Sequence, residues 1–102
     1  MPQNPIGVSI NAETYANTST SLNITTATVI KSSVGVINRV SVIVAGTTAG
    51  SVNDTTTTGA AATTNEVFSI PNTTGMYQVN FPCKNGIVVV PGTGQTIAVA
   101  FD

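Results

Sequence analysis

The most informative absence in this chain of 102 residues is histidine, of which there is none. Histidine is the usual general base, proton shuttle and metal ligand near neutral pH, so Ser–His and Cys–His nucleophile arrangements are excluded. The four carboxylates are spread along the chain, at Glu13, Asp54, Glu66 and Asp102. Asp54 and Glu66 are the pair that a fold could assemble as in a glycosidase, but nothing in the sequence brings them together, and Asn53-Asp54 alone offers few oxygen ligands for calcium. We therefore expect no enzymatic activity, no metal site and no cofactor.

Charge of either sign is scarce. Only 7% of the residues are charged, against roughly 25% in ordinary soluble domains. The net charge is −1, so electrostatic repulsion does little to keep copies of the chain apart. The three basic residues, Lys31, Arg39 and Lys84, are scattered and cannot neutralise a phosphate backbone. The composition argues against a nucleic-acid partner and suits a protein that lives in an assembly.

Cysteine and long apolar runs are also scarce or absent. The single Cys83 excludes an internal disulfide, and its alternating neighbours predict a buried, small side chain. No apolar run reaches the ~20 residues that a membrane span needs. Residues 1–5 have neither the basic nor the apolar region of a signal peptide. We expect no membrane partner, and no signal peptide is predicted.

Threonine, asparagine and serine are abundant instead, with 18, 10 and 8 copies, and they favour strands and turns over long helices. The longest apolar stretch runs from Gly35 to Gly46 and predicts a buried central strand over 36–44. Alternation sorts its side chains into two faces. The face expected in the core consists of Val36, Asn38, Val40, Val42 and Val44, with the asparagine as its single polar member. The other, mixed face consists of Ile37, Arg39, Ser41 and Ile43.

Shorter strands and dense turns account for the remaining chain. We expect strands at 22–31, 51–56, 66–70, 76–83, 87–90 and 97–101. In the first of them, Leu22, Ile24 and Ile30 are expected on one face. The run 55–64 predicts a surface loop. The 22–31 strand is expected to pair with the central strand, because sequential strands most often lie side by side. Asn85-Gly86 predicts a hairpin tip that pairs Phe81 with Val90, and residues 91–95 predict another hairpin turn.

These elements predict an all-β fold, a single small β-sandwich or barrel of seven to eight strands formed by residues 22–102. Residues 1–21 contain little apolar matter and predict an extended N-terminal arm that ends in a loop at 17–21. Within it, Ile6, Val8 and Ile10 alternate as in a short strand that has no partner nearby. Such a strand can pair with the sheet edge of another subunit; the alternative is that it covers an edge of its own domain or stays disordered until it docks.

From Val29 onward the chain resembles small all-β proteins encoded among the structural genes of tailed phages and prophages. The stretches that carry the resemblance are Val29-Ile30-Lys31, Gly35 to Val42, Ala49 to Asp54, and Phe81 to Val89. They are turns and core strands, so they identify a shape more than an activity. The resemblance implies a structural virion component of the capsid decoration (cement) type, with no catalytic function.

The expected role is therefore to bind and stabilise the outer surface of a capsid. The expected partners are the major capsid protein and further copies of the chain, with a trimer favoured. We expect Ile6, Val8, Ile10 and Tyr15 of the arm to supply an oligomer or capsid contact. The alternative is a receptor- or carbohydrate-binding module on a phage fibre or appendage. Scarce aromatics count against that alternative, since the chain has five and four of them fit strand cores.

Overall fold

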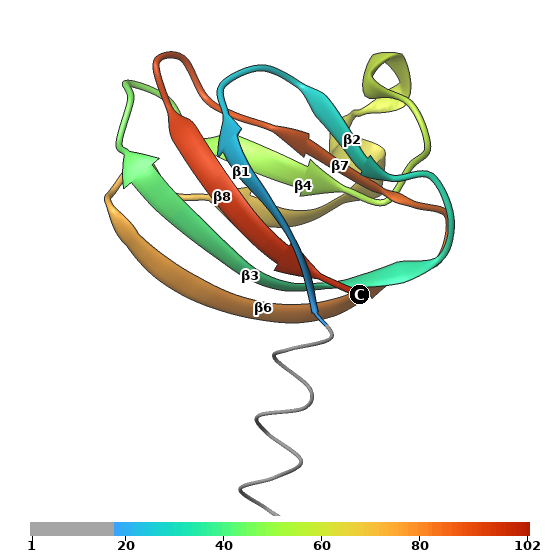
Figure 1. The fold of residues 1–102 in the computed structure, drawn as a ribbon. Helices are drawn as coiled ribbons and strands as arrows, with labels where there is room; N and C mark the ends of the chain where they lie inside the picture. The colour runs from blue at the N-terminus through green and yellow to red at the C-terminus, as the bar shows by residue number, and fades with distance from the viewer. Residues whose placement is uncertain (1–17) are drawn as a thin grey trace, which may run out of the picture.

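The computed structural model describes residues 18–102, in which eight strands and two short 3-10 turns form a two-layer sandwich (Figure 1). The all-β prediction is confirmed. The elements are β1 (Ser19–Ile24), β2 (Thr28–Lys31), β3 (Gly35–Val44), β4 (Gly50–Asn53), η1 (Thr58–Ala60), η2 (Thr63–Asn65), β5 (Glu66–Ile70), β6 (Gly75–Cys83), β7 (Ile87–Val90) and β8 (Thr96–Phe101).

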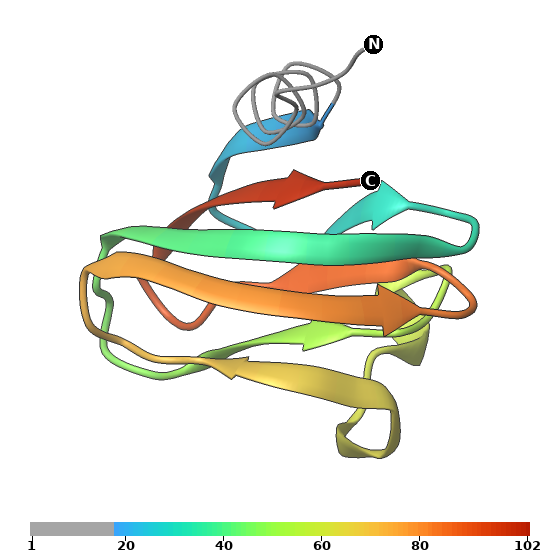
Figure 2. The ribbon, with the colours of Figure 1, turned by 90° about the horizontal axis from the view of Figure 1, so that it is seen from below.

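The strand order identifies the fold as a jelly roll. One antiparallel sheet has the order β1-β8-β3-β6 and the other the order β2-β7-β4-β5. Figure 2 shows the first sheet edge to edge, with β1 in blue, β8 in red, β3 in green and β6 in orange. The outermost strands of the sequence, β1 and β8, pair with each other, as do β2 with β7, β3 with β6, and β4 with β5. This nested pairing defines the eight-stranded, double-sheet jelly roll.

The jelly roll overturns the predicted hairpins. The 22–31 segment is two strands, β1 and β2, which lie in different sheets, and β2 pairs with β7 instead of β3. Asn85-Gly86 links β6 to β7 and residues 91–95 link β7 to β8, and each link passes between the sheets. Phe81 consequently pairs with Ile37 and not with Val90. A turn signal specifies where the chain reverses, whereas the burial of two apolar sheet faces against each other decides which strands pair.

A β-bulge in β3 changes which of its side chains reach the core. Between the pairs Ile37–Phe101 and Arg39–Ala100, β3 contains Asn38 as an extra residue. Ile37 is therefore buried on one side of the bulge, and Val40 and Val42 on the other. Alternation correctly predicted that Val40 and Val42 lie in the core, but it placed Ile37 on the opposite face. It also wrongly predicted that Val36 and Val44 are buried, since Val36 is partly exposed and Val44 is 50% exposed. An extra residue in one strand shifts the phase of all that follows.

A second bulge, in β1, determines which side chains of the first strand face the core. Strand β1 begins at Ser19, so the loop predicted at 17–21 is wrong for its last three residues. Ser21 pairs with Val99 and Ile24 with Ile97, which leaves Leu22 and Asn23 opposite a single residue, and Asn23 has a positive φ of 56°. Ile24 consequently enters the core while Leu22 is 71% exposed, although alternation placed both on one face.

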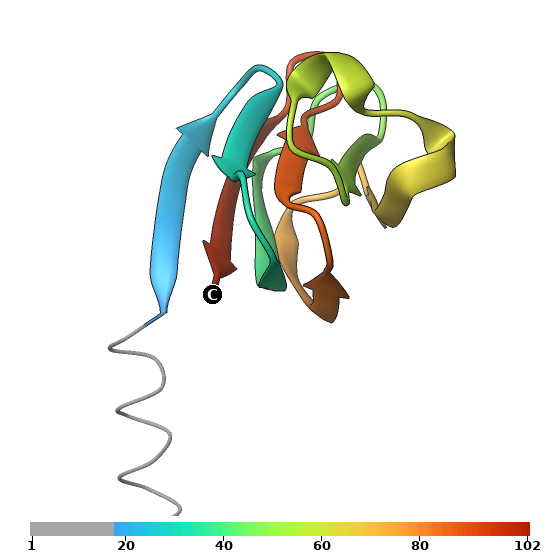
Figure 3. The same ribbon diagram turned by 90° about the vertical axis from the view of Figure 1, so that its right-hand side faces the viewer.

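Strand β7 is covered on both faces. Ile87 and Val89 belong to the core between the sheets, and Val88 is fully buried as well. The η1 turn contacts β7. It belongs to the segment between β4 and β5, which is exposed over most of its length and projects from the sandwich in Figure 3. The prediction of a surface loop at 55–64 is confirmed, and so is the burial of Cys83.

A buried glutamine ties together three loops at one end of the sandwich. Gln95 is 1% exposed. Its Oε1 accepts from the Gly92 backbone amide at 2.9 Å, and its Nε2 donates to the carbonyls of Pro71 at 2.9 Å and Ala45 at 3.4 Å. A Cβ at Gly92 would overlap the Thr48 carbonyl, so glycine is required for this close approach.

Candidate binding groove on the outer sheet face

The arm residues expected at an interface, Ile6, Val8, Ile10 and Tyr15, lie outside the described residues, as does Glu13. The described part of the chain begins at Thr18 and leads directly into β1.

Asp54 has a structural role. Its carboxylate accepts hydrogen bonds from the backbone amides of Lys84 at 2.9 Å, Asn85 at 2.8 Å and Gly86 at 3.3 Å. Partial desolvation raises the pKa of this carboxyl, but these hydrogen bonds outweigh it and bring the pKa below its ordinary value. Asp54 therefore fastens the turn that passes from one sheet to the other.

Asn53 and Glu66, the other candidate residues near Asp54, also lie in or beside the loop between β4 and β5. Asn53 is 1% exposed, and its Nδ2 donates to the Ala62 carbonyl and to Asn65 Oδ1, both at 2.9 Å. Glu66 is an exposed residue of β5, opposite Asn53 in the ladder. Among residues 18–102, no three His, Cys, Asp or Glu side chains are grouped so as to hold a metal ion.

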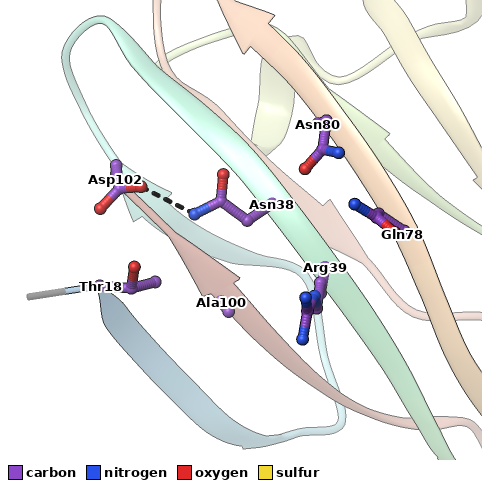
Figure 4. Close-up of a pocket in the computed structure, with 7 residues that line it drawn as sticks. All are labelled: Thr18, Asn38, Arg39, Gln78, Asn80, Ala100 and Asp102. Carbon is purple, nitrogen blue, oxygen red and sulfur yellow. Dashed lines mark hydrogen bonds between the residues drawn. The ribbon is translucent and has the colours of Figure 1, made fainter. Parts of the chain in front are cut away.

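A polar groove lies on the outer face of the β1-β8-β3-β6 sheet. It has a volume of about 250 Å³ and is lined by Thr18, Asn38, Arg39, Gln78, Asn80, Ala100 and Asp102. Figure 4 shows Asn38 and Arg39 on β3, Gln78 and Asn80 on β6, Ala100 on β8, Asp102 just after β8 and Thr18 just before β1. In a chain with only seven charged residues, one cation, one carboxylate and three amides meet here.

The bulges create this groove. Because Asn38 is the extra residue of β3, it lies on the outer face beside Arg39 instead of in the core. Its Nδ2 donates to Asp102 Oδ2 at 2.8 Å. Opposite it, β6 contains both Val79 and Asn80 between its pairs with Ile37 and Arg39, and Asn80 adopts a positive φ of 52°. Asn23 is the other non-glycine residue with a positive φ among residues 18–102.

An apolar groove continues the polar one along the same sheet. It has a volume of about 230 Å³ and shares Arg39 and Ala100 with its neighbour. Its floor includes the small side chains Ser41 and Ala98, which face each other in the β3–β8 ladder. Leu22 on β1 and Met76 on β6 also line it. The outer sheet face thus has a polar end and an apolar end.

Sequence reasoning missed both grooves, although one signal was available. Asn38 was the single polar residue on a face of β3 that was expected to be apolar, and that irregularity marks the bulge. Gln78 and Asn80 are exposed on the outer side of β6, where they line the polar groove. The signal could not reveal that β6 lies next to β3, because that pairing joins residues about 40 positions apart.

The chain matches no family model, no curated protein and no solved structure. No helix among the described residues has the length and apolar character to cross a membrane.

Proposed function

We propose that this protein is a structural component of a virion, a capsid decoration (cement) protein that binds the outer capsid surface as a homo-oligomer, with a trimer favoured, and contacts the major capsid protein. The resemblance from Val29 onward supports this proposal. The jelly roll supports it by analogy, since viral capsid domains use that fold. Lectins and cupins use it too, so the fold by itself does not assign a function.

The observation that carries the proposal is a strip of exposed apolar side chains on the outer face of one sheet. Leu22 is 71% exposed and Met76 66%. Together with Ala98 they line the apolar end of the β1-β8-β3-β6 face, and we call these three residues the apolar strip. Contiguous exposed apolar surface on a small protein usually marks a contact with another macromolecule.

We assign the apolar strip to contact with a second copy of the chain. The net charge is −1, so two copies approach each other with little electrostatic cost. The floor of the apolar groove is made of small side chains, which lets a partner's larger side chains enter between Leu22 and Met76. The contact would leave the opposite sheet available for the capsid.

The test of this assignment is the molar mass of the purified protein. The double variant Leu22→Ser/Met76→Ser should shift the mass measured by light scattering from an oligomer toward the monomer. Val29→Ser is the matched control, because Val29 is 40% exposed on β2 of the other sheet. A wild-type monomer, or a double variant that keeps the wild-type mass, would contradict the assignment.

The virion role has its own test. Particles purified from the phage or lysogen that encodes the chain can be labelled with an antibody against it and viewed by electron microscopy. We expect label over the capsid surface. Label on tail fibres would support the alternative, a receptor- or carbohydrate-binding module, and particles without label would refute both.

A further inference from the structure

We propose that the polar groove binds a single ring of a neutral carbohydrate. This site adjoins the apolar strip without including any of the residues that define the strip, and it goes beyond the proposed capsid role. The volume of about 250 Å³ sets the scale. A cavity of about 150 Å³ accommodates benzene, whereas drug-sized ligands need about 300–1,000 Å³. A six-membered sugar ring lies between these limits.

The hydrogen-bonding groups of the groove suit hydroxyl groups. A hydroxyl both donates and accepts, and a side-chain amide offers both a carbonyl oxygen and an NH₂ group. Asn38, Gln78 and Asn80 supply three such side-chain amides to the lining of the groove. Within residues 18–102, the amides of Gln78 and Asn80 are exposed and have no hydrogen-bond partner, so a ligand would not have to displace an existing one.

The charge balance of the groove favours a neutral ligand. The side chains of Arg39 and Asp102 contribute one charge of each sign. The Asp102 carboxylate accepts from Asn38 at 2.8 Å, and its negative charge opposes a phosphate, a sulfate or an acidic sugar at that end. A hydroxyl can donate to the same carboxylate, which gives a charge-assisted hydrogen bond.

The backbone around the groove points to a constructed site. The bulges at Asn38 and at Val79–Asn80 lie side by side on neighbouring strands, and together they bring the amides onto one face. Bulges recur beside binding and active sites because they re-aim side chains. Asn80 adopts a left-handed backbone conformation at this position. Such conformations are a form of local strain that is concentrated at functional sites.

The affinity should be weak. Ala100 is the apolar side chain that lines the groove, and no aromatic ring does, so a sugar face would rest on one methyl group. We therefore expect a dissociation constant in the millimolar range, which corresponds to roughly 4 kcal/mol of binding free energy. Such affinities are measurable by nuclear magnetic resonance.

The experiment is a titration of the isotope-labelled full chain with the methyl glycosides of glucose, galactose, mannose and N-acetylglucosamine. We expect at least one of them to shift the side-chain amide signals of Asn38, Gln78 and Asn80 in a saturable way. The variant Gln78→Ala/Asn80→Gly should weaken that binding by at least about tenfold. Glycine keeps the positive φ of residue 80 accessible, so the fold is preserved.

Two controls make the outcome decisive. Asn72→Ala removes an amide from an exposed loop and should leave the titration unchanged. The molar mass of Gln78→Ala/Asn80→Gly should equal that of the wild type, which separates this site from the apolar strip. The proposal is overturned if none of the four glycosides gives saturable shifts, if the double variant binds as well as the wild type, or if inorganic phosphate shifts the same signals at lower concentration.

Discussion

The Asp54 carboxylate accepts a hydrogen bond at 2.8 Å from the backbone amide of Asn85, 31 residues further along the chain. The same carboxylate also accepts from the amides of Lys84 and Gly86. It thereby joins the end of β4, in one sheet, to the turn that leaves β6, in the other. An Asn-Gly pair that looks like a hairpin tip is in fact a crossing between layers, held by one side chain.

Replacing this carboxylate should destabilise the domain. Asp54→Ala leaves three backbone amides without their acceptor, and we expect a loss of about 2–3 kcal/mol in the free energy of unfolding. Urea denaturation monitored by circular dichroism measures it. Thr57→Ala, in the exposed part of the same loop, is the control and should change stability by less than about 0.5 kcal/mol. Equal stability of the two variants would mean that the turn does not depend on Asp54.

The same contact should make stability depend on pH in the acidic range. The pKa of Asp54 is lower in the folded state than its ordinary value. Its contribution is therefore fully present above the unfolded pKa of about 3.9 and is lost as the pH falls through the folded pKa. Comparing unfolding of the wild type and Asp54→Asn between neutral and acidic pH isolates this contribution. The stability gap between them should narrow as the pH falls, and a gap that stays constant would contradict the assignment.

Gln95 should be among the most sensitive polar residues. Gln95→Ala removes a buried side chain and leaves the Gly92 amide and the Pro71 carbonyl without their partner. We expect a loss of about 3 kcal/mol or more, and each kcal/mol lowers the melting temperature of a domain of this size by about 4–8 °C. Gln78→Ala is the control, since Gln78 is exposed. A melting temperature close to that of the wild type would show that these loops hold together without Gln95.

The bulge in β3 can be tested with two neighbouring residues. Ile37 is fully buried and Val36 is partly exposed, the reverse of simple alternation. Ile37→Thr should cost about 2–3 kcal/mol because it buries a hydroxyl and removes apolar volume, whereas Val36→Thr should cost less than about 1 kcal/mol. If Val36→Thr lowered the free energy of unfolding more than Ile37→Thr in urea denaturation, the assignment of Ile37 to the core and Val36 to the partly exposed face would be contradicted.

Cys83 should be unreactive in the folded protein. Desolvation, with a smaller effect from the negative charge of Asp54, raises the pKa of its thiol to about 11, and the side chain is fully buried. Because the thiolate is the reactive form, a disulfide reagent at pH 8 should modify Cys83 only after unfolding in guanidinium. Rapid modification of the native protein would mean that this end of the core opens readily.

The sequence by itself determined the local structure of the protein. β-branched residues and alternation located the strands at 66–70 and 76–83 and the buried run at 87–90, because side-chain direction along a strand is set by its own backbone. The absence of histidine also limited the available chemistry without reference to the fold, because residue types are a property of the sequence alone.

Only the tertiary structure decided which strands pair and which side chains face outward. The partner of β1 is β8, about 80 residues away, and that choice follows from burying two apolar sheet faces against each other. Each bulge is a mismatch in length between neighbouring strands, so it exists only once the neighbours are known. Asn38, Leu22 and Asn80 owe their outward positions to such mismatches or to the strands beside them. The grooves they line are for that reason a property of the assembled sheet and not of any one segment.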